Sequence, residues 1–80
     1  MDINFMVSSL LPFISKKDVS YYSGLKIEKL TLLVSLAPFV NNPDTMMKLS
    51  KLDIVILKEL IGKLPHLDDN ELEKYLNHIL

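Results

Sequence analysis

The feature that most constrains the fold of this chain is the stretch Leu52 to Leu64, with the sequence LDIVILKELIGKL. On a helical wheel its apolar side chains cover a face of roughly 200°, which is wider than the single stripe of an ordinary surface helix. A helix of this kind needs neighbours on two sides. The stretch therefore predicts a helix at the centre of an all-helical core. The apolar side chains are those of Leu52, Ile54, Ile56, Leu57, Leu60, Ile61 and Leu64.

Both ends of this stretch carry residues that are typical of helix boundaries. Ser50 and Asp53 form the pattern Ser-x-x-Asp, a relative of the capping box in which the acidic residue also favours the positive end of the helix dipole. Pro65 disfavours helical geometry for the residue before it. We therefore expect Ser50 to cap the helix and Leu64 to end it.

A second long apolar helix is predicted from Leu25 to Ala37, where Pro38 ends it. Two wide apolar faces are best buried against each other, so this helix is the expected partner of the stretch Leu52 to Leu64. The core of that contact is predicted to consist of Leu30, Leu33, Val34, Ile56, Leu57, Leu60 and Ile61.

Two further helices are predicted before and between these long ones. An uncharged helix runs from Ile3 to Leu11. The pattern Ser-x-x-Asp recurs at residues 15–18 and should begin a short helix, which Gly24 would end in the left-handed conformation. Of the two tyrosines in that short helix, Tyr21 and Tyr22, we expect one to pack and the other to keep its hydroxyl in water.

The remaining helices follow well-marked caps. Asn42 should cap a helix from Pro43 to Leu49, in which a methionine pair fills the core or serves an adaptable binding surface. A last helix should follow Asp68 or Asp69. Its apolar face, which we expect to pack to the end of the chain, consists of Leu72, Tyr75, Leu76, Ile79 and Leu80. The predicted fold is an all-α compact bundle of five or six short helices in a single domain, residues 1–80.

Two segments resemble each other at an offset of 26 residues. They are SLLPFI at residues 9–14 and SLAPFV at residues 35–40, and a fainter third copy is LPHL at residues 64–67. Stacked helical repeats would produce this pattern and commonly present a partner surface. The alternative is that helix-ending chemistry recurs in any leucine-rich helical chain. Both alternatives predict an all-helical fold.

Composition indicates that the chain associates with a partner. It contains 16 Leu, 7 Ile, 5 Val, 4 Met and 3 Phe against a single Ala, which is more apolar volume than a domain of 80 residues readily encloses. We expect a homodimer, a higher oligomer or a complex with another protein. The uncharged first helix is the expected contact surface, with Phe5, Met6 and Phe13 as anchors, because interface centres favour aromatic and Met side chains and exclude charge.

Charge argues against two other classes of partner. All nine basic residues are Lys, and the net charge is −1, so the chain lacks both the Arg that most often reads guanine and a strong positive field for phosphate. The longest uncharged run, Ile3 to Ser15, is shorter than the roughly 20 residues of a membrane span. We expect neither nucleic-acid binding nor membrane insertion.

No pattern in the sequence predicts catalysis, a cofactor or a metal. The chain has no Cys, no Gly-rich phosphate loop and no His-x-x-x-His spacing. Its two histidines, His66 and His78, could at most form a metal site with Asp69 or Glu73, and a solvated surface position is the simpler interpretation of both. The absence of Cys also fits a reducing, cytoplasmic setting.

The leading hypothesis is a small helical protein–protein interaction module, a regulator or adaptor, that self-associates or binds a protein partner, and it is not an enzyme. The main alternative is a helix-turn-helix DNA-binding regulator, in which Leu52 to Ile61 would be the first helix of the motif. The helix after Pro65 is acidic where a recognition helix would need donors. A membrane-active peptide is the third class.

Overall fold

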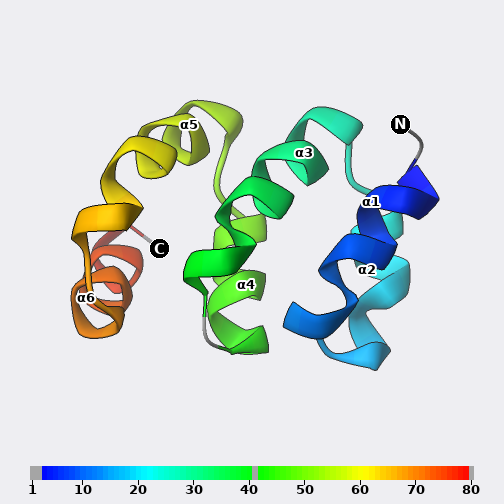
Figure 1. The fold of residues 1–80 in the computed structure, drawn as a ribbon, viewed down its shortest axis with the longest axis horizontal. Helices are drawn as coiled ribbons and strands as arrows, with labels where there is room; N and C mark the ends of the chain where they lie inside the picture. Colours follow the sequence, from blue (N-terminus) through cyan, green and yellow to red (C-terminus); the bar gives the residue numbers. More distant parts are fainter. Residues whose placement is uncertain (1–2, 41, 80) are drawn as a thin grey trace.

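Six α-helices and no strand make up the described part of the chain, residues 3–40 and 42–79 of a computed structural model. Three pairs of helices stand side by side along the longest axis of the molecule, which extends over 31 Å (Figure 1). The first pair is α1 (Ile3–Leu10) and α2 (Val19–Ser23), the second is α3 (Ile27–Leu36) and α4 (Pro43–Ser50), and the third is α5 (Ile54–Lys63) and α6 (Asp69–Ile79). The all-α bundle predicted from the sequence is confirmed.

The middle pair, and not the stretch Leu52 to Leu64, organises the packing, so the prediction that this stretch forms the central helix is wrong. Helix α3 contacts α1 on one side and α5 on the other, while α4 contacts both α3 and α6. The predicted pairing of the two long apolar helices is therefore confirmed as the contact between α3 and α5.

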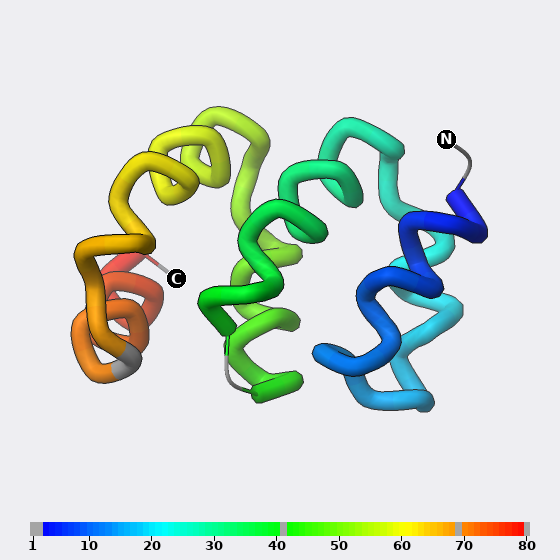
Figure 2. Tube along the Cα trace, viewed as in Figure 1, coloured from blue at the N-terminus to red at the C-terminus, as the bar shows by residue number. Residues whose placement is uncertain are grey.

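The same proline-marked turn ends the first helix of each pair. Short 3₁₀ helices follow α1, α3 and α5 at Leu11–Phe13 (η1), Ala37–Phe39 (η3) and Leu64–His66 (η4), each with Pro in its first turn, where the missing N–H costs nothing. The next residue is extended in all three: Ile14 has φ −129°, Val40 has φ −112° and Leu67 has φ −107°. Figure 2 shows the chain reversing at each of these turns. A common origin of the three pairs stays a prediction.

The core runs through all three pairs. Its fully buried large side chains are Leu10, Tyr22, Leu30, Leu33, Leu36, Met46, Leu49, Leu57, Leu60 and Leu76. Of the seven predicted core residues, Leu30, Leu33, Leu57 and Leu60 are buried, and Val34 and Ile56 are half-buried against the core. The prediction for Ile61 is wrong, because 38% of its surface is exposed.

Helix caps agree with the sequence at α4 and α6, but not at the short 3₁₀ helix Lys16–Asp18, where the side chain of the predicted cap Ser15 makes no capping hydrogen bond. The Asn42 carboxamide accepts a hydrogen bond from the Thr45 amide at 2.8 Å, as predicted. Asp68 accepts one from the Glu71 amide at 2.8 Å, and the Glu71 carboxylate accepts in return from the Asp68 amide at 3.3 Å, which is a reciprocal capping box.

The predicted cap of α5 is wrong. Asp53, not Ser50, accepts the hydrogen bond from the Ile56 amide, at 3.0 Å. Ser50 is instead the last residue of α4, where its hydroxyl donates to the Met47 carbonyl at 2.6 Å. The helix consequently begins at Ile54.

The short helix α2 differs from its prediction at its end. Gly24 has φ −87°, so the predicted left-handed conformation does not occur. Tyr22 is fully buried, as expected for one tyrosine of the pair, and Tyr21 is 39% exposed, but its hydroxyl bonds to the protein and not only to water. The Tyr21 hydroxyl lies 3.0 Å from the Ser50 Oγ atom and so links α2 to the end of α4. Burial raises the pKa of Tyr22 to about 12.

The prediction that the chain packs to its end falls partly outside the described residues, because Leu80 is not among them. Ile79 is half-buried against the core. Within residues 3–40 and 42–79, no helix is long and apolar enough to cross a membrane.

Candidate interaction surface

The three predicted interface residues lie in different environments. Phe5 is on the outer side of α1 and is 57% exposed, the largest exposure of the three. Met6, the next residue, points into the core and is only 5% exposed. Phe13 lies in η1, half-buried against the core. Phe5 is thus largely exposed to solvent, whereas Met6 and Phe13 pack toward the core beneath it.

Sequence spacing assembles further residues around Phe5. Side chains three or four positions apart are neighbours on a helix, so Phe5 adjoins Ser8, and Ser8 adjoins Leu11 and Pro12 just beyond the end of α1. All four are exposed, and 47% of the Leu11 surface is accessible. We call these four residues the α1 surface. The sequence reasoning missed Leu11, which lies six positions from Phe5 and so is not its direct neighbour on a helix.

The α1 surface carries no charge. The run Ile3 to Ser15 contains no Asp, Glu, Lys or Arg, and α1 stands at one end of the row of helix pairs (Figure 1). The helices at the other end expose Lys58, Glu59 and Lys63 on α5 and Glu71 and Lys74 on α6. Terminal units of stacked helical arrays normally present a polar outer face. The helix α1 itself carries no such charge, although Lys16 and Lys17 are exposed in the connection that follows it, and the α5–α6 end follows the rule.

A polar cluster between α4 and α6 has a structural role. Glu73 on α6 accepts hydrogen bonds from the Thr45 hydroxyl at 2.5 Å and from the Lys48 ammonium at 2.9 Å. These bonds, that of Thr45 first, hold the pKa of the Glu73 carboxyl below its usual value. They join two helices that come from different pairs, so the cluster fixes the third pair against the second.

The structure also shows where the residues of the metal-site and DNA-binding hypotheses lie. His66 lies in η4 and His78 on α6, and both are exposed. On α6, the helix that would read DNA in the helix-turn-helix alternative, Glu71 caps the helix and Glu73 binds Lys48. That alternative stays a prediction.

No family model, no curated protein and no solved structure matched this chain in our searches.

Proposed function

We propose that this protein is a small helical interaction module, a regulator or adaptor, that self-associates through the α1 surface. The observation that carries the proposal is an uncharged, exposed surface at one end of the fold, centred on Phe5 with 57% exposure and Leu11 with 47%. Exposed large apolar side chains on an uncharged helix are candidates for protein association.

Physical chemistry favours a second copy of the chain as the occupant. A two-fold contact places each surface against its own equivalent, so any charge near the centre would meet a like charge. The α1 surface has none, and this makes it self-compatible. An exposed Phe is also a suitable anchor, because aromatic side chains supply large contact area at low conformational cost.

Within this proposal the predicted anchors take different parts. Phe5 makes the contact together with Leu11, while Met6 and Phe13 hold α1 and η1 on the core beneath it. The chain has no Cys, which is compatible with a reducing compartment, and we place its activity in the cytoplasm as part of the same proposal.

Phe5→Asp tests the proposal. Because Phe5 is largely exposed, the variant should keep its helical far-UV circular dichroism, and two Asp side chains facing each other across a two-fold contact should abolish association. Size-exclusion chromatography with light scattering should show a dimer or higher oligomer for the parent chain and a monomer for the variant.

Val55→Asp is the matched control, since Val55 on α5 is 66% exposed and lies away from the α1 surface. It introduces the same charge and should leave the oligomer intact. A folded Phe5→Asp variant that remains fully oligomeric would move the contact to another surface. Equal loss of association in both variants would show that the change in net charge, and not the α1 surface, controls assembly.

A further inference from the structure

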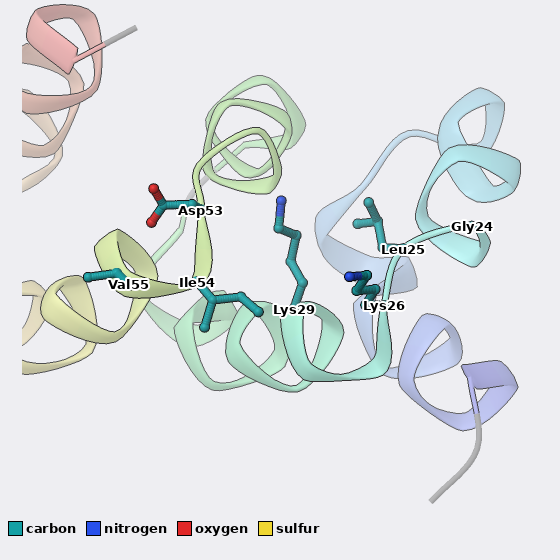
Figure 3. Close-up of a pocket in the computed structure, with 7 residues that line it drawn as sticks. All are labelled: Gly24, Leu25, Lys26, Lys29, Asp53, Ile54 and Val55. Atoms are coloured by element: carbon teal, nitrogen blue, oxygen red, sulfur yellow. The ribbon is translucent and has the colours of Figure 1, made fainter.

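A cleft on another part of the molecule combines an apolar floor with two lysines. It has a volume of about 650 Å³ and opens between the connection from α2 to α3 and the beginning of α5. Figure 3 shows Leu25, Lys26 and Lys29 on one side and Asp53, Ile54 and Val55 on the other. The volume lies within the range of small-molecule sites, which are mostly apolar with a few placed polar groups.

The lysines give the cleft a positive character. Lys29 is half-buried, and its Nζ atom donates a hydrogen bond to the Ser50 carbonyl at 3.0 Å. An ammonium group has three donors, so two remain for a ligand after that bond. Lys26 is exposed at the rim. Among the described side chains of residues 3–40, 42–68 and 70–79, neither lysine forms an ion pair.

The single acid of the cleft does not neutralise them. One oxygen of Asp53 accepts the hydrogen bond from the Ile56 amide and caps α5. Its carboxylate points away from both lysines in Figure 3. The ligand that matches this arrangement has an anionic head for the two ammonium groups and an apolar body for Leu25 and Ile54, both of which are half-buried.

We propose that this cleft binds a single-chain amphipathic carboxylate of the fatty-acid class, with its head between Lys26 and Lys29 and its chain over Leu25 and Ile54. This binding is separate from the self-association proposed above, because no residue of the α1 surface lines the cleft.

The test is a titration of the 15N-labelled full chain with decanoate, below its micelle concentration, followed by amide chemical shifts. Decanoate should shift the amides of Gly24 to Lys26 and of Asp53 to Val55 in a saturable way. Decanol supplies the chain without the charge, and acetate supplies the charge without the chain. Each should bind at least tenfold more weakly than decanoate, the factor that corresponds to losing about 1.4 kcal/mol.

Lys26→Glu supplies the decisive variant, because an exposed side chain can be reversed in charge without disturbing the core. It should weaken decanoate binding about tenfold or more. Lys17→Glu changes the net charge equally at an exposed position outside the cleft and should bind as the parent does. Decanol binding as tightly as decanoate, shifts centred on another surface, or unchanged affinity in a folded Lys26→Glu variant would each overturn the proposal.

Discussion

Leu60 and Ile61 are consecutive residues of α5 that differ sharply in environment. Leu60 is fully buried, and Ile61 is 38% exposed. Leu60→Ala should lower the free energy of unfolding by about 2 to 5 kcal/mol, because it removes buried methyl groups and leaves a cavity. Ile61→Ala should lower it by only about 0.5 to 1 kcal/mol. Urea denaturation of both variants at one protein concentration measures the difference, and equal losses would contradict the burial assigned here.

The same pair of residues shows the limit of periodicity at this scale. Helical spacing correctly selected Leu57 and Leu60, which are buried in the core and lie on a helix that packs against α3. It also predicted burial for Ile61, although α5 belongs to an end pair and lacks a further helix beyond it. Periodicity reports which side chains share a face. It does not report how many neighbours cover that face.

At the scale of the helix, the sequence identified some caps and missed others, and the Ser15 side chain, expected to begin a helix, makes no capping hydrogen bond. Asn42 caps α4 as expected, by accepting a hydrogen bond from the Thr45 amide. Ser50 and Asp53 were both candidates for the N-cap of α5. The sequence pattern did not reveal that Ser50 would be the last residue of α4, with its hydroxyl bonded to the Met47 carbonyl. The error comes from competition between two adjacent helices for one hydroxyl. Local chemistry alone cannot resolve such a competition.

The contact between α4 and α6 predicts a pH dependence of stability. Hydrogen bonds from Thr45 and Lys48 lower the pKa of Glu73 in the folded chain below its usual 4.5. A lowered pKa means that folding favours the ionised form, so this contribution is fully present above pH 4.5 and is lost as the pH falls through the folded-state pKa. Because 37% of the Glu73 side chain is exposed, solvent screens the effect, and we expect it to be modest.

Glu73→Gln provides the measurement. Thermal unfolding of the parent chain should lose more stability between pH 6 and pH 3 than the variant does, and the two curves should converge at the acid end. These pH limits are approximate, about one to two units on each side of the usual carboxyl pKa. Glu59→Gln, at an exposed position on α5, serves as control and should follow the parent. Parallel curves for all three proteins would show that the Glu73 cluster contributes nothing.

At the scale of the whole molecule, the sequence predicted the all-helical fold but only part of the candidate sites. An uncharged first helix could be read directly, and Phe5 was selected from it. Met6 was selected too, although one residue along a helix changes the side that a side chain faces. The cleft between Lys26, Lys29 and Ile54 was missed entirely, because it forms only when two connections far apart in the sequence come together in the fold.

Self-association of the chain is the central claim, and the dependence of molar mass on concentration tests it most directly. Sedimentation equilibrium from low to high micromolar concentration should give a mass that rises toward at least twice the 9.2 kDa of the chain. In the Phe5→Asp variant, the mass should stay at that of the single chain over the same concentrations. A mass that stays at 9.2 kDa over the whole range, in a folded and soluble parent chain, would contradict the claim.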